Sequence, residues 1–149
     1  MIEKEFIPYE LALKLKQLGF NEPCIMQVSW LNDVHKDTKI PFGPIVYING
    51  KDIQFEYDLP KKHPIDGFNC LELNIPTYAQ AFRWFREKYK LDLSINTVYT
   101  GYNELTTKNY SAVVDDCGSF TNVGFYKTYE EAELACLKKL IEIVKERRN

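Results

Sequence analysis

The segment 128–147 places the strongest constraint on the fold, because it is an amphipathic helix with both of its ends marked. It opens with Thr128-Tyr-Glu-Glu131, which fits a capping box. Acidic residues follow at the positive end of the helix dipole, and basic residues occupy its negative end. The apolar arc is wider than the roughly 100° of an ordinary surface helix; it contains Ala132, Leu134, Cys136, Leu137, Leu140, Ile141, Ile143 and Val144. So wide an arc predicts packing on two neighbours, or on a sheet plus a partner.

Two further helices are predicted from proline starts and apolar periodicity. One begins after Pro8 and stops at Gly19, with an inward face of Leu11, Leu15 and Leu18. Tyr9 and Leu13 are expected to point away from that face and to be available to a partner. The other helix follows Pro76 and reaches about residue 90, with an apolar stripe of Tyr78, Phe82, Phe85 and Tyr89.

Strand patterns fill the intervals between the helices. Asn49-Gly50, a strong hairpin turn signal, separates strands predicted at 44–48 and 51–57. The remaining strands are predicted at 25–30, 93–100, 110–115 and 120–126, with a turn at Asp116-Cys117-Gly118. Segments 58–75 and 100–108 show no clear period and are expected to be loops. We therefore expect an α+β fold with antiparallel sheet and three helices, in the order α-βββ-α-βββ-α, forming a single domain over 1–149.

Composition excludes several classes of protein. An aromatic share of 14% and a net charge of −2 argue against a disordered chain and against nucleic-acid binding by bulk charge. The N-terminus lacks the basic start and apolar run of a signal peptide, and no apolar run approaches the ~20 residues of a membrane span. Four cysteines without a C-x-x-C pair favour reduced thiols, so we expect a cytoplasmic protein with no membrane partner.

Catalytic and metal-binding patterns are weak. His35 lies near Asp33 and Asp37, but only one other histidine, His63, exists to complete a metal site. The pair Asp115 and Asp116 beside Cys117 is interpreted as turn residues, because neighbouring strand residues point to opposite faces.

No phosphate-binding glycine loop, nucleophile elbow or H-E-x-x-H motif is present. We therefore assign no catalytic residue, no metal ligand and no cofactor, and favour a protein that is not an enzyme.

The second helix carries the most informative surface. At about 100° per residue, Arg83, Arg86 and Lys90 lie within about 60° of one another and form a basic stripe beside the apolar one. One interpretation is a solvated face, with Arg83 and Glu87 as an i, i+4 pair. The alternative is an anion site, in which these cations bind a phosphate or carboxylate. Trp84, expected off the apolar stripe, would stack on a flat ring there, and Lys61 and Lys62 would add charge.

Three blocks of the sequence together resemble a known group of proteins. They are PYELALKLKQLGFNEPC at 8–24, PTYAQAFRWFREKY at 76–89 and TYEEAELACLKKLIEIVK at 128–145. In this order they resemble small uncharacterised proteins from Bacteroidota and their phages, which have no established activity. The resemblance implies a bacterial or phage cytosolic setting and implies no catalytic residues.

The order α-βββ-α of 77–147 is also similar to that of double-stranded RNA-binding domains. Those domains place basic residues at the start of the last helix, whereas Glu130, Glu131 and Glu133 stand there in this chain. Binding of double-stranded nucleic acid is therefore disfavoured. The expected function is a non-enzymatic binding or interaction protein that self-associates or binds a protein partner. The alternatives are a binder of a small anionic ligand of the nucleotide type, such as a phage counter-defence sponge, and a nucleic-acid-binding module.

Overall fold

The computed structural model describes residues 2–31, 43–52 and 70–149. The chain divides into two compact units, Met1–Pro76 and Thr77–Asn149, which are described separately below. The single domain expected over 1–149 stays a prediction. Among the helices of the described ranges, none combines the length and the apolar composition that a transmembrane span requires.

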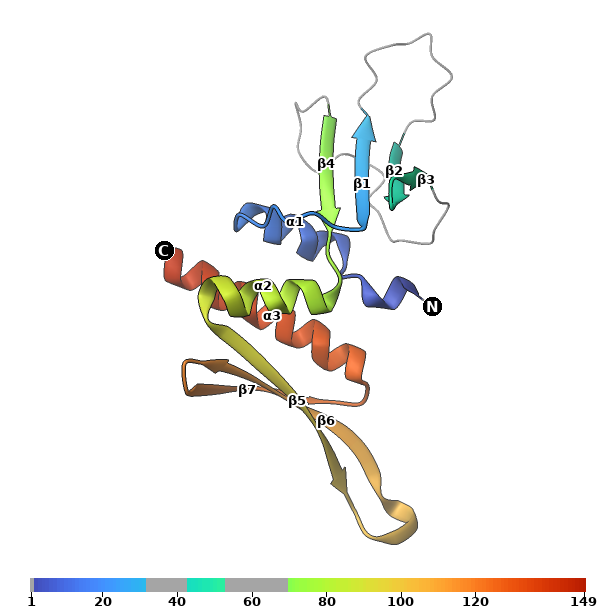
Figure 1. The fold of residues 1–149 in the computed structure, drawn as a ribbon. Coiled ribbons are helices and arrows are strands. Elements are labelled where there is room, and N and C mark those ends of the chain that lie inside the picture. The colour runs from blue at the N-terminus through green and yellow to red at the C-terminus, as the bar shows by residue number, and fades with distance from the viewer. Residues whose placement is uncertain (1, 32–42, 53–69) are drawn as a thin grey trace. The chain divides into compact units, whose positions relative to one another are not determined.

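The first unit holds one α-helix and an antiparallel sheet (Figure 1). Helix α1 (Tyr9–Gln17) follows a short 3-10 turn, η1 (Ile2–Glu5), and its face of Leu11, Leu15 and Leu18 is buried, as expected. The sheet has the order β3-β2-β1-β4, with β1 (Met26–Leu31), β2 (Gly43–Ile48), β3 (Lys51–Asp52) and β4 (Cys70–Ile75). Asn49 and Gly50 join β2 to β3 and have positive φ angles of 52° and 72°, which confirms the predicted hairpin turn.

Two expectations for this unit are wrong. Residues 70–75 are not loop but strand β4, which pairs with β1 along its whole length. The segment alternates apolar and polar residues, and Leu73 and Ile75 are fully buried, which is the pattern of a half-buried strand. The aperiodic residues before it in the sequence hid this pattern. Tyr9 is also buried rather than available to a partner, because the buried surface of α1 extends to Tyr9 and Ala12, beyond the leucine face.

The second unit folds two helices onto one face of a three-stranded antiparallel sheet (Figure 1). The elements are α2 (Tyr78–Tyr89), β5 (Leu91–Thr100), the 3-10 turn η2 (Asn103–Leu105), β6 (Thr107–Asp116), β7 (Ser119–Tyr126) and α3 (Tyr129–Arg148). Helix α3 contacts α2 and all three strands, as its wide apolar arc predicted. Its capping box is present: the amide of Glu131 donates to the hydroxyl of Thr128 at 3.2 Å, and the amide of Thr128 donates to the carboxylate of Glu131 at 3.3 Å.

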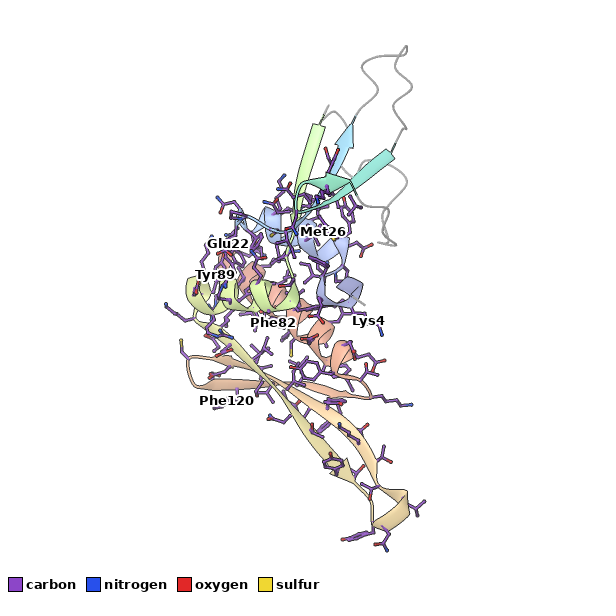
Figure 2. All side chains as sticks on the ribbon, turned by 45° about the vertical axis from the view of Figure 1, so that its right-hand side comes forward. Lys4, Glu22, Met26, Phe82, Tyr89 and Phe120 are labelled. Atoms are coloured by element: carbon purple, nitrogen blue, oxygen red, sulfur yellow. The ribbon has the colours of Figure 1, made fainter. Side chains whose placement is uncertain are left out.

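Small side chains bring α3 close to the sheet. Ala112 on β6 and Ala132 and Cys136 on α3 form a fully buried cluster. Around it pack Phe82, labelled in Figure 2, and Leu93, Ile95, Tyr110, Val123 and Tyr126. The opposite face of the sheet carries no helix from this unit.

The α+β class, the antiparallel sheets and the order α-βββ-α-βββ-α are therefore confirmed. In the first group, the strands predicted at 25–30 and 44–48 correspond to β1 and β2, and the strand predicted at 51–57 begins as β3. Strand β4 is a fourth member of that sheet. The rest of the strand predicted at 51–57 lies outside the described residues.

Candidate functional site

Helix α2 presents the predicted basic stripe to solvent, and at least two of its cations have partners within the chain. Arg83, Arg86 and Lys90 are exposed. The Nε atom of Arg86 lies 3.2 Å from a carboxylate oxygen of Asp92, and both side chains are about half exposed. Lys90 caps the helix with a left-handed φ of 57°, and its Nζ atom donates to the carbonyl of Glu87 at 3.1 Å. The stripe therefore offers less free positive charge than its composition suggests.

Trp84 is buried, so the expectation that it lies off the apolar stripe is wrong. Only 5% of its surface is exposed. Its ring meets Phe85 and Tyr89 edge-on, with centroids 5.1 and 5.3 Å apart, and the ammonium of Lys88 lies 5.1 Å from the ring centroid. The physical reason is that the small, fully buried Ala81 extends the apolar arc of α2 towards Trp84. With Trp84 included, the arc is about 160° wide. This ring is not placed to stack on a ligand beside the basic stripe.

The other cations predicted for the anion site, and both histidines, belong to segments that the structure does not describe. Lys61, Lys62 and His63 lie outside the described residues, as does the cluster of His35 with Asp33 and Asp37. Within the described ranges, no group of three or more His, Cys, Asp or Glu side chains is placed to hold a metal ion.

The carboxylates near Cys117 hold the turn between β6 and β7. Asp115 accepts a hydrogen bond from the amide of Gly118 at 2.7 Å, and Asp116 forms an ion pair with Arg147. Cys117 occupies a left-handed position with a φ of 51°. The predicted turn is confirmed at Cys117 and Gly118. The interpretation of Asp115 and Asp116 as turn residues is wrong, because both pair with β7 as the last residues of strand β6.

The hairpin of β5 and β6 extends beyond the rest of its sheet. Strand β7 pairs with β6 only from Asp116 to Tyr110, whereas β5 and β6 stay paired as far as Thr100 and Thr107. Residues 98–109 therefore form a two-stranded projection, called the arm below, which Figure 1 shows extending past the end of β7. The sequence predicted the strands but not this extension, because the pairing at 107–109 depends on residues about ten positions away.

The tip of the arm is a defined turn. Gly101 has a φ of 103°, and a Cβ atom there would overlap the carbonyl oxygen of Leu105. The hydroxyl of Thr106 donates to the carbonyl of Asn103 at 2.7 Å, and the amide of Leu105 donates to the carbonyl of Tyr102 at 3.3 Å. This local bonding fixes which side chains the tip presents.

The arm presents large apolar side chains to solvent. Tyr102 is 90% exposed, Leu105 84% and Tyr99 66%. Tyr99 and Tyr102 also lie close together in the sequence, with Tyr110 nearby, whereas nothing in the sequence marks Leu105. Glu104 and Lys108 are the charged residues of 98–109, and the rest are threonine, asparagine, glycine and apolar residues. Tyrosine with small polar residues is typical of protein-binding loops, because it gives contact area at a low cost in conformational entropy.

At the base of the arm, an aromatic and cationic cluster supports the hairpin. Tyr110 meets Tyr129 edge-on with centroids 5.8 Å apart, and the ammonium of Lys108 lies 5.4 Å from the Tyr110 ring. The hydrogen bond with Tyr110 raises the pKa of Lys108. These contacts join the arm to the start of α3, and its distal residues project from that base.

Comparisons with protein-family models, with curated proteins and with solved structures found no match.

Proposed function

We propose that this chain is a non-enzymatic binding protein that recognises a protein partner through the arm. The observation that carries the proposal is the exposure of Tyr99, Tyr102 and Leu105 together at the end of a two-stranded projection. A two-stranded ribbon is marginally stable in water, because it buries little surface. A projection of this kind with an apolar tip gains stabilisation when a partner covers it.

The charge of the arm favours a protein partner over nucleic acid. Glu104 and Lys108 cancel, so the arm offers no positive field to a phosphate backbone. The unit Thr77–Asn149 has the order α-βββ-α, yet Glu130 and Glu131 are exposed at the start of α3 and would repel phosphate. Tyrosine, leucine and threonine are suited to the core of a protein interface.

The proposed setting is the cytoplasm of a bacterium or of a phage-infected cell, in line with the sequence resemblance. The proposed role needs no cofactor or metal ion. Recognition requires only that the tip keep its shape, and the left-handed Gly101 and the Thr106 hydrogen bond serve that purpose.

Site-specific photo-crosslinking in the host cell tests the proposal. A photoreactive residue at position 102 is expected to give a discrete adduct with one protein. The control position is 142, on the exposed surface of α3. Adding Leu105→Ser should abolish the adduct, whereas adding Arg83→Glu should leave it unchanged. Equal labelling from both positions, or no adduct from position 102, contradicts the proposal.

A second candidate is a small anionic ligand of the nucleotide type on α2. The observation in its favour is the exposure of Arg83, Arg86 and Lys90 along one flank. Its weakness is that Trp84 is buried and that Arg86 is paired with Asp92. A thermal-shift screen of nucleotides tests it, with Arg83→Glu expected to abolish any rise in melting temperature and Lys145→Glu, on α3, as the matched control. A screen without a rise removes this candidate.

A further inference from the structure

Strand β7 is an edge strand without the usual protection of an edge. Its one neighbour in the described part of the chain is β6, so the other side of its backbone has no strand partner there. Its sequence, SFTNVGFY, contains no charged residue and no proline. Edge strands normally carry charges or proline, which prevent pairing with another chain. The opposite edge strand of the same sheet, β5, carries Asp92, which pairs with Arg86.

A register shift in β7 places two exposed phenylalanines on one face. Phe120 and Phe125 are five residues apart and would point to opposite faces of a regular strand. The shift between Ala112 and Val113 adds one residue to β7, so that Phe120 lies opposite Asp115 and Phe125 opposite Ser111. Asp115 and Ser111 are four residues apart on β6, so the two phenylalanines opposite them share one face. Ala112, next to Ser111, packs against α3 on the other face, so both phenylalanines lie on the face that α3 does not cover. They are 71% and 64% exposed, and Phe120 is labelled in Figure 2.

We propose that β7 pairs antiparallel with β7 of a second copy, which joins the two sheets across a two-fold axis. The register that overlaps the whole strand sets Ser119 opposite Tyr126 of the second copy. It then sets Phe120 opposite Phe125, and this pair occurs twice by symmetry. Residues directly opposite in an antiparallel pair share a face, so all four rings gather on the uncovered side.

The neighbouring registers are less favourable. A shift of one residue would set Phe120 opposite Gly124 or Tyr126, which lie on the helix-covered face with Ala112 and Tyr110. The phenylalanines would then lose their cross-strand partners. The self-complementary arrangement is therefore specific to the register of full overlap.

Charge and space also permit a second copy. Because β7 has no charge, pairing it with itself opposes no like charges. On the helix side, beside the end of β7, lies a hollow of about 320 Å³ lined by Tyr126, Glu131, Leu134, Ala135 and Lys138. It leaves room there for side chains of an added strand.

The exposed area indicates a dimer that dissociates on dilution. At roughly 200 Å² for a full phenylalanine side chain, the two rings expose about 270 Å² per copy. The four rings of a dimer then supply about half of the ~1,200 Å² of a small stable interface, and the paired backbones must supply the rest. We therefore expect self-association that depends on protein concentration.

Sedimentation velocity of the full chain over a hundredfold range of concentration tests this. The expected result is a monomer–dimer equilibrium. Phe120→Lys combined with Phe125→Lys should raise the dissociation constant at least tenfold, because both symmetric pairs become like-charged. Phe120→Lys combined with Phe125→Glu should restore dimerisation, since the register sets opposite charges across the axis. Tyr102→Lys, on the arm, is the matched control and should leave the equilibrium unchanged.

Hydrogen exchange of the wild-type chain gives a reading that does not depend on how the variants fold. Amides of 119–126 should gain protection as concentration rises, while those of 101–106 should not. A wild-type chain that stays monomeric throughout overturns the proposal. So does a dimer that the double lysine variant leaves intact, a variant pair without rescue, or protection elsewhere than β7.

Discussion

Replacing Trp84 by alanine tests whether this residue belongs to the core rather than to a ligand site. Trp84 is 5% exposed and lies edge-on to Phe85 and Tyr89. Truncating a buried tryptophan removes its transfer free energy and leaves a cavity, which costs about 3–5 kcal/mol. The two edge-on ring contacts contribute to this loss, at about 0.5–1.5 kcal/mol each. We therefore expect Trp84→Ala to lower the free energy of unfolding by about 4 kcal/mol.

Urea unfolding followed by far-ultraviolet circular dichroism measures this change, because it does not depend on tryptophan fluorescence. Tyr102→Ala is the matched control, since Tyr102 is aromatic and 90% exposed, and it should change stability by less than about 0.5 kcal/mol. A loss below about 1 kcal/mol for Trp84→Ala would refute the burial argument and would make the ring available to a ligand again.

Further perturbations test other parts of the structure. Thr128→Ala removes the capping box of α3 and should cost about 1 kcal/mol in urea unfolding, whereas a neutral result would contradict the cap. Cys117 is exposed and Cys136 fully buried, so Ellman's reagent should label Cys117 in the native chain and reach Cys136 only on unfolding; equal rates would refute this. Burial raises the pKa of the Cys136 thiol from 9.0 to about 11, so the unfolded chain releases this proton first. Stability should therefore fall as pH rises from about 9 to 11, and Cys136→Ala should flatten that fall in urea titrations. Gly101→Ala should disorder the arm tip, seen as faster amide exchange at 102–106, and unchanged exchange would count against the strain there.

Local signals in the sequence predicted much of the fold. The capping box at Thr128 and the Asn49-Gly50 turn depend on neighbouring residues, and the structure confirms both. Strand β4 and the burial of Trp84 depend on pairing and packing with distant residues, so periodicity alone missed them.

The candidate site divides in the same way. The cations of α2 and the tyrosines of the arm could be found from spacing and composition. The exposure of Leu105 could be predicted only from the length of the hairpin. The shared face of Phe120 and Phe125 could be predicted only from the register shift in β7. Both are set by strand pairing, which the sequence does not specify locally.

If the arm recognises a protein partner, the affinity for that partner depends on the side chains at the arm's tip. The protein captured from position 102 is purified and titrated calorimetrically with the wild-type chain and with variants. We expect Tyr102→Ala to weaken binding at least tenfold, as for an aromatic residue at the centre of an interface. For Arg83→Glu we expect a change in affinity below twofold. Unchanged binding by Tyr102→Ala together with loss of binding by Arg83→Glu would rule out recognition by the arm and would place it on α2.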